Sequence, residues 1–247
     1  MKFADPYILR FKQPKSKILF ASSQLQGDRD RQEDYFINFN DECFAIADGV
    51  GGIPNAQEAA MFACETAMWG YKHIRLRPGY WKDKRLFIRR IFRSTNISLW
   101  QKQREMAYKD GMATTLLVCV IGVRTVWLGS VGDSRAYLYH DHRLIRLTED
   151  DIDENGTLTK AVGVVRYGLM PQYVAKEFLV GDSLILVTDG VSRFMSDTDI
   201  SNVVESVGVT AQSLSDAVVE LFGKATRKGS TDNMTAILIK RVATEIH

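Results

Sequence analysis

The order of strand-type and helix-type segments is the feature that most restricts the fold of this chain. Strands come first, two helices follow, and a run of strands, one helix and a final strand complete the order. In chain order the predicted elements cover 17–25, 35–40, 43–48, 56–74, 85–106, 114–122, 125–133, 136–141, 182–189, 213–229 and 233–242. An alternating βα fold needs a helix after each strand. This order therefore predicts an α+β architecture with mostly antiparallel sheets covered by helices.

Composition and charge narrow the class further. The 247 residues carry a net charge of +2, which does not indicate a protein that binds nucleic acid. No low-complexity linker divides the chain, so we expect residues 1–247 to form a single domain. The three cysteines, Cys43, Cys64 and Cys119, lie in apolar segments and are expected to be buried free thiols. The N-terminus lacks a signal-peptide pattern and no apolar run can span a bilayer, so we expect a cytoplasmic protein without a membrane anchor.

Two apolar runs end in the same three residues. "FAIADGVGG" (44–52) and "LILVTDGVS" (184–192) both pass from a buried strand pattern into Asp-Gly-Val. Other acids also stand at predicted strand ends: Glu33, Asp34, Asp133 and Asp232. Taken singly, an Asp-Gly pair after a strand is typical of a turn. The sequence alone does not show that these acids meet in space.

If they meet, the residue types indicate a particular chemistry. Several partly desolvated carboxylates repel one another and are tolerated when cations neutralise them. Carboxylate, carbonyl and water oxygens are ligands suited to Mg²⁺ or Mn²⁺. A glycine after the aspartate allows a close backbone approach and leaves a carbonyl free to bind. The pattern thus favours a site for hard divalent cations.

Eight short motifs, in order, give the chain a resemblance to a known family. They are "GDRDRQEDYF", "FAIADGVGG", "DGMATTLLVCVI", "VGDSRAYLY", "LTEDD", "LTKAVG", "LILVTDGVS" and "STDNMTAILI". Together they resemble the motifs of the PPM family of metal-dependent protein serine/threonine phosphatases, the type 2C-like enzymes, and most of all its short bacterial members. The resemblance implies a four-layer αββα sandwich, with two central sheets flanked by helices and a two-metal centre in the cleft between the sheets.

The resemblance also implies roles for individual residues. Asp48 would bridge two Mn²⁺ or Mg²⁺ ions, and the carbonyl of Gly49 would bind one of them. Asp189 and Asp232 would hold the other ion.

Glu33 and Asp34 would act through metal-bound waters, and Arg29 would bind the substrate phosphate. The implied reaction is hydrolysis of phosphoserine or phosphothreonine in proteins by a water shared between the two ions. Arg29 and Asp48 are the implied catalytic residues, and no cysteine or serine nucleophile is needed.

The chain departs from the family pattern in several places. Val50 stands where the animal enzymes have a histidine thought to protonate the leaving group. Asp110 precedes the Gly-Met segment and is carried over as the ligand of a third, weaker metal, with a solvated loop carboxylate as the alternative. Only "DIDENGT" (151–157) remains of the flap subdomain, so we expect a more open cleft. Asp133 and Arg135 we interpret as structural residues.

The expected partners are phosphorylated proteins, in a signalling role opposite a serine/threonine kinase. A basic stretch, residues 72–93, is interpreted as solvated helix faces, with docking of an acidic partner as the alternative. Two further hypotheses remain beside the active phosphatase. One is a pseudophosphatase that binds phosphoproteins without turnover, although none of the metal aspartates is missing. The other is a bacterial regulatory phosphatase that acts on antagonists of anti-sigma factors.

Overall fold

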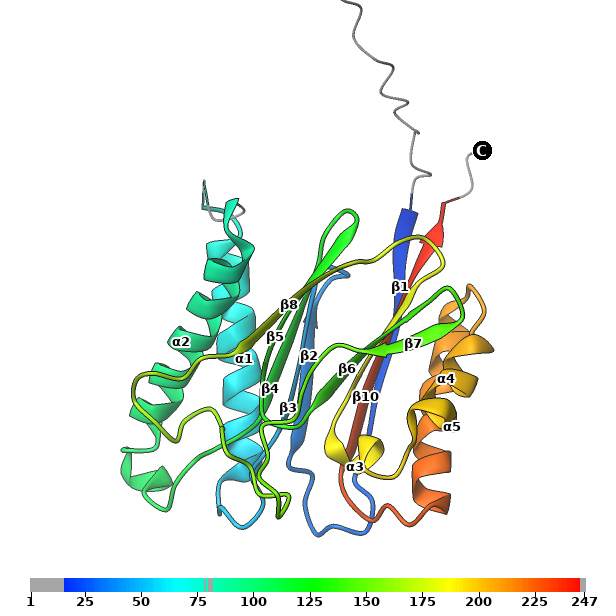
Figure 1. The fold of residues 1–247 in the computed structure, drawn as a ribbon. Helices are drawn as coiled ribbons and strands as arrows, with labels where there is room; N and C mark the ends of the chain where they lie inside the picture. The colour runs from blue at the N-terminus through cyan, green and yellow to red at the C-terminus, as the bar shows by residue number, and fades with distance from the viewer. Residues whose placement is uncertain (1–15, 78, 80–81, 245–247) are drawn as a thin grey trace, which may run out of the picture.

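The computed structural model describes residues 16–77, 79 and 82–244 of the chain. Within these residues, ten strands form two five-stranded antiparallel sheets that lie between two groups of helices (Figure 1). The α+β class and the layered sandwich expected from the sequence are confirmed. No helix among the described residues is long and apolar enough to cross a membrane.

Each sheet combines strands from distant parts of the chain. The first sheet, in spatial order, contains β1 (Ser16–Leu25), β10 (Met234–Ala243), β9 (Ser183–Val187), β6 (Arg135–His140) and β7 (Arg143–Arg146). The second sheet contains β2 (Asp34–Phe39), β3 (Cys43–Asp48), β4 (Leu116–Ile121), β5 (Thr125–Val131) and β8 (Gln172–Glu177). The chain crosses from the second sheet to the first between β5 and β6.

The helices cover the outer faces of the two sheets. Helices α1 (Ala56–Ile74) and α2 (Lys84–Lys102) pack on the second sheet, while α4 (Asp197–Glu205) and α5 (Ala211–Arg227) pack on the first (Figure 1). Two short elements complete the described structure: the 3₁₀ turn η2 (Met106–Tyr108) and α3 (Asp189–Ser192).

Strands β3, β4 and β9 contain uninterrupted apolar runs because both of their faces are buried. In β3, Cys43 and Ala45 face the core beneath α1 and α2, whereas Phe44 and Ile46 face the core between the sheets. All three cysteines are free and buried, as expected. A strand buried on both sides has no polar face, which explains why the sequence shows runs instead of alternation.

Helix ends differ from the sequence prediction in two places. Helix α5 begins at Ala211, two residues before the predicted start, because the Thr210 hydroxyl accepts a hydrogen bond from the Ser213 amide at 3.2 Å. Thr210 is therefore the N-cap, three residues before the predicted start of the helix at Ser213. Helix α2 ends at Lys102, four residues earlier than predicted.

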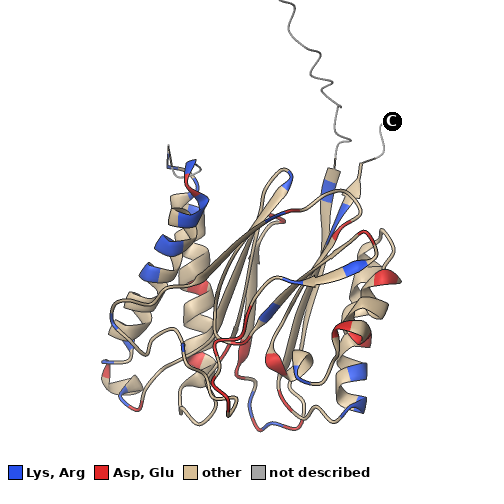
Figure 2. Ribbon diagram, viewed as in Figure 1, with Lys and Arg blue, Asp and Glu red and all other residues tan. Residues whose placement is uncertain are grey.

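The basic stretch lies mainly on the outer surface of α2. Phe87, Ile88, Ile91 and Phe92 of this helix are buried against the second sheet. The arginines between and beyond them are exposed: Arg85, Arg89, Arg90 and Arg93. Figure 2 shows these basic residues along the outer side of α2, away from the acidic residues between the sheets. This is the arrangement of an amphipathic surface helix.

The pair formed by His140 and Asp182 predicts a pH-dependent contribution to stability. His140 Nδ1 lies 2.7 Å from Asp182 Oδ1, and this hydrogen bond raises the histidine pKa above 6.5, with smaller contributions from the charges of Asp141 and Glu177. A raised histidine pKa stabilises the fold below pH 6.5, and that stabilisation is lost as the pH rises through the raised value. We expect His140→Gln to lower the urea midpoint more at pH 5.5 than at pH 8.5. An equal loss at both pH values would contradict the assignment.

Candidate active site

Strand register brings the predicted acids to one end of the sandwich. In the antiparallel pair of β2 and β3, Asp34 is the direct partner of Asp48. The pair of β6 and β9 has Arg135 opposite Val187, and the chain continues from these residues to Asp133 and Asp189.

Asp48 therefore lies at the end of β3, Asp189 just after β9 and Asp133 just before β6. These three carboxylates, which come from both sheets, face the same space. One ligand oxygen each from Asp48, Asp133 and Asp189 lies within 4.8 Å of the other two. Figure 2 shows the acidic residues gathered at the end of the sheets where β3 and α3 lie.

These carboxylates line a cleft between the sheets of about 300 Å³. Its walls are formed by Arg29, Glu33, Asp48, Gly49, Val50, Gly51, Thr115, Asp133, Gly156, Thr157, Leu158, Asp189, Arg193, Asp232 and Asn233. Six of the predicted site residues are among them. The cleft thus collects segments that are separated by more than two hundred positions in the sequence.

Asp34 lies beneath the cleft. It is 2% exposed, and its Oδ2 accepts hydrogen bonds from the hydroxyls of Thr188 at 2.8 Å and Thr235 at 2.7 Å. Its Oδ1 is buried and has no hydrogen-bond partner among the described residues. Burial is the main cause that raises the pKa of Asp34 to about 7. A buried carboxylate oxygen without a partner is costly, and a metal or metal-bound water is the kind of group that satisfies it.

Burial and nearby negative charges also raise the pKa values of other carboxylates in the cleft. Burial, followed by the charges of Asp34 and Asp189, raises the pKa of Asp48 well above its usual range. Burial and the charge of Asp133 raise the pKa of Asp189. Divalent cations remove this repulsion, and an all-oxygen set of ligands fits Mg²⁺ or Mn²⁺. The residues present therefore fit the metals that the sequence predicts.

Arg29 reaches the rim of the cleft from the loop between β1 and β2. Its Nη2 donates to Asp232 Oδ2 at 2.7 Å, and this hydrogen bond is the main cause that raises the arginine pKa. The arginine side chain is 53% exposed. A guanidinium has five N–H donors, so one bond to Asp232 leaves others to meet an anion in the cleft.

Asn233 holds that loop, a role that the sequence analysis did not assign. The residue is 5% exposed, and its Oδ1 accepts from the Glu33 amide at 2.7 Å. Its Nδ2 donates to the carbonyls of Gln26 at 2.7 Å and Arg31 at 2.9 Å. One buried side chain thus fixes both ends of the segment that carries Arg29. The signal in the sequence was an amide directly after Asp232, at the start of the last strand.

Comparison with known proteins identifies the family. The family model described as Protein phosphatase 2C matches residues 23–238. The chain belongs to the protein phosphatase 2C family.

Individual relatives agree with this family assignment. The serine/threonine phosphatase stp of Listeria monocytogenes serovar 1/2a is 25% identical over 233 residues, covering 83% of this chain and 87% of that protein. The crystal structure of the serine/threonine phosphatase Stp1 from Staphylococcus aureus superposes with a TM-score of 0.79 at 22% identity, over 96% and 99% of the two chains. The catalytic domain of the phosphatase PstP, solved with two manganese ions, superposes with a TM-score of 0.75 at 24% identity, over 92% and 100%.

The structure also gives the positions of three other residues that the sequence analysis interpreted. Asp133, interpreted as structural, lies in the carboxylate cluster and lines the cleft. Asp110, carried over as a ligand of a third metal, lies exposed in a turn and is not among the residues that line the cleft. Arg135, in contrast, forms an ion pair with Asp150 at 2.7 Å and bonds the Ser192 carbonyl at 3.1 Å, as a structural residue does.

Residues 151–157, interpreted from the sequence as the remainder of a flap, form a small closed turn at the cleft. Ile152 and Leu158 form an isolated β-bridge, and the Asp153 carboxylate accepts hydrogen bonds from the amides of Asn155 and Thr157, both at 2.9 Å. Gly156 follows in the left-handed region, with φ of 79°. Gly156, Thr157 and Leu158 line the cleft, so the turn forms one of its walls.

Proposed function

We propose that this chain is a metal-dependent protein serine/threonine phosphatase that hydrolyses phosphoserine and phosphothreonine in proteins. The convergence of Asp48, Asp189 and Asp232 on one cleft beside Arg29 carries the proposal. The carboxylates give a site for Mn²⁺ or Mg²⁺, and the arginine gives a donor set matched to phosphate oxygens. When bound, two such ions lower the pKa of a shared water and neutralise charge on the phosphate.

The individual roles are those that the resemblance to the family implies. We assign Asp48 to both ions, the Gly49 carbonyl to one and Asp189 and Asp232 to the other. Asp232 is 31% exposed on its side chain and can reach an ion while still near Arg29.

In this proposal Glu33 and Asp34 would hold the ions through water. Asp34 suits that part because its buried Oδ1 has no partner among the described residues, while the two threonine hydroxyls fix the orientation of the carboxyl group. Arg29 holds the phosphate in line for attack. Val50 lines the cleft and offers no side-chain general acid at its position.

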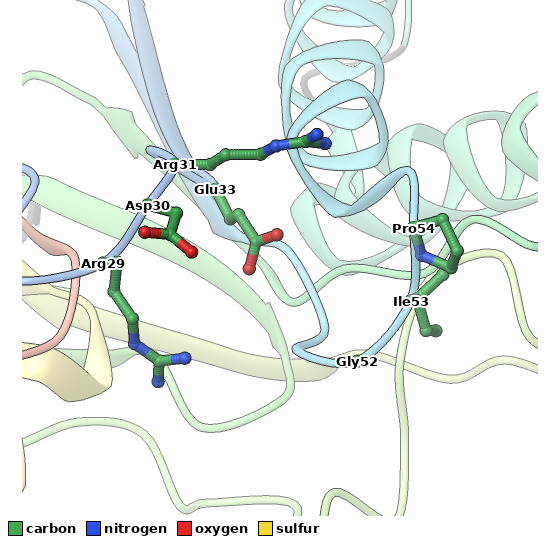
Figure 3. A pocket seen from close by; sticks show the side chains of 7 residues that line it. All are labelled: Arg29, Asp30, Arg31, Glu33, Gly52, Ile53 and Pro54. Atoms are coloured by element: carbon green, nitrogen blue, oxygen red, sulfur yellow. The ribbon is translucent and has the colours of Figure 1, made fainter.

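A second cavity beside the cleft suits the polypeptide part of the substrate. It has a volume of about 400 Å³ and shares Arg29 and Glu33 with the cleft. Figure 3 shows these two side chains directed into the space that faces Gly52, Ile53 and Pro54. A chain that crosses this cavity would present its phosphorylated side chain to the metals.

The cellular location and the partners of the protein are also proposed. We place the protein in the cytoplasm of a bacterium as a single phosphatase domain over residues 1–247, with a flap reduced to residues 151–157. Its partners are phosphorylated proteins and the serine/threonine kinase that modifies them. Nucleic acid and membrane are not proposed as partners.

Metal-dependent turnover is the direct test. We expect phosphate release from a phosphothreonine peptide with Mn²⁺ or Mg²⁺ and none with excess chelator. Metal binding without turnover on phosphoserine and phosphothreonine peptides would favour the phosphoprotein-binding alternative instead.

Arg29→Ala is expected to lower kcat/KM by about 10- to 100-fold, because a hydrogen bond to a charged group contributes about 1.5–3 kcal/mol. Arg124→Ala is the matched control, since Arg124 is a half-exposed arginine at the opposite end of β5 that pairs with Glu177. Equal activity of the two variants would remove Arg29 from the phosphate site.

A further inference from the structure

One arginine side chain already occupies part of the carboxylate cluster. Arg193 Nη2 lies 2.9 Å from Asp133 Oδ2, and Arg193 Nε lies 2.9 Å from Asp189 Oδ2. The same guanidinium therefore bridges two of the three carboxylates that come within 4.8 Å of one another. The third, Asp48, lines the cleft.

Local structure explains how Arg193 reaches this position. Asp189 is the first residue of α3, and the Arg193 amide donates to the Asp189 carbonyl at 2.9 Å. Residues four apart on a helix lie on the same face, so the arginine side chain folds back over Asp189. Asp133 lies on the other side, in the connection between β5 and β6. The guanidinium thus joins the end of one sheet to the crossover from the other.

Burial makes this bridge different from an ordinary surface ion pair. The side chains of Asp133 and Asp189 are 6% and 12% exposed, whereas that of Arg193 is 50% exposed. Two nearly buried carboxylates side by side need a positive charge. A guanidinium supplies that charge at every accessible pH and cannot dissociate from the protein as a metal ion can.

We propose that Arg193 takes the place of a cation between Asp133 and Asp189, so that this chain binds two divalent ions and not a third. The inference rests on the proposed function, because it concerns how the same centre is neutralised. It assigns Asp133 to an internal ion pair in place of a metal. It also makes Arg193 a positioning residue, which acts on the reaction only through the orientation of Asp189.

The opposite possibility is that Arg193 swings into solvent when metal is present. Its half-exposed side chain has the freedom to do so, and Asp133 and Asp189 would then accept a third ion. The two possibilities differ in the number of ions bound and in the effect of removing the arginine. Counting ions separates them without any measurement of activity.

The experiment measures bound Mn²⁺ by equilibrium dialysis with elemental analysis, and free Mn²⁺ by electron paramagnetic resonance. We expect two ions per wild-type chain at saturation and an additional ion in Arg193→Gln, which keeps the shape but removes the charge. Arg193→Lys keeps a charge and is expected to bind two. Arg143→Gln, which changes an exposed arginine on β7, is the control and should match the wild type.

Metal-free stability gives a second readout. Without Mn²⁺, Arg193→Gln should have a lower Tm than the wild type, because Asp133 and Asp189 lose their counter-charge. Mn²⁺ should raise the Tm of Arg193→Gln by more than it raises the Tm of the Arg143→Gln control. Three ions in the wild type, or two in Arg193→Gln under saturating Mn²⁺, would overturn the proposal and leave the phosphatase assignment intact. A wild type that binds no ion would overturn both.

Discussion

Asp48→Asn is expected to abolish metal-dependent phosphate release, with kcat lower by about 10³-fold or more, while the metal-free protein becomes more stable. The catalytic loss follows from the position of Asp48, which lies at the centre of the carboxylates and is assigned to both ions. Removal of a single group that stabilises charge in a transition state costs about 10²–10³-fold in kcat, and the loss of a ligand shared by two ions should exceed that.

The stability gain has a separate physical cause. In the metal-free protein, burial and the neighbouring charges of Asp34 and Asp189 disfavour the ionised form of Asp48. Asparagine keeps the shape, removes the charge and can donate a hydrogen bond to Asp189. We expect a gain of roughly 1–2 kcal/mol, or about 2–8 °C in Tm for a chain of this size.

Thermal unfolding in chelator tests the expected stability gain, and thermal unfolding in Mn²⁺ tests the expected loss of metal binding. Mn²⁺ should raise the Tm of the wild type much more than that of Asp48→Asn. The difference in Tm between the two proteins should therefore become smaller or change sign when metal is added. Asp41→Asn, which changes an exposed aspartate at the other end of the same strand pair, should show neither effect. A metal-free Asp48→Asn less stable than the wild type would argue that Asp48 is held by structural contacts instead of crowded by charge.

Much of the sandwich could be predicted because its central strands are buried on both faces. Such strands appear as apolar runs, and β3, β4, β9 and β10 were all predicted within two residues of their observed bounds. The strands that the sequence did not predict are not buried on both faces. Strands β7 and β8 lie at sheet edges, and half of the residues in "RLIR" and "QYVAKE" are polar, so neither shows the long apolar run of a central strand. Helix α4 was detectable, because Ser196 and Asp199 form a capping box before its apolar residues.

The site was predictable one residue at a time but not as a cluster. Acids at strand ends are visible in the sequence, yet their distances depend on register between strands far apart in the chain. Asp133 and Asp189 meet because Arg135 pairs with Val187, and nothing local to either aspartate carries that information. Arg193 could be found only after α3 was known, since the four-residue spacing matters on a helix and not in a turn.

Gly49→Ala is expected to damage both the fold and the site, whereas Gly51→Ala, two residues along the same loop, should do neither. A Cβ added at Gly49 would stand 2.3 Å from the carbonyl oxygen and 2.5 Å from the carbonyl carbon of Ala56. Ala56 begins α1, so the clash is with helix backbone and no side chain can turn away to relieve it. At Gly51 no heavy atom lies within 4 Å of an added Cβ, and the backbone is in an ordinary region.

The expected cost at Gly49 is about 1–3 kcal/mol of unfolding free energy, the usual range for an overpacked site. Activity should fall by roughly 10²-fold, because relief of the clash moves the Gly49 carbonyl and the adjacent Asp48, and a displacement near 1 Å is enough for such a loss. Gly51→Ala should stay within about 0.5 kcal/mol of the wild type. Urea unfolding and kinetics at saturating metal, both measured on Gly49→Ala and Gly51→Ala, test these expectations. A Gly49→Ala variant that keeps wild-type kcat but loses stability would show that the loop yields toward α1, and that the carbonyl at this position is not needed by the metal.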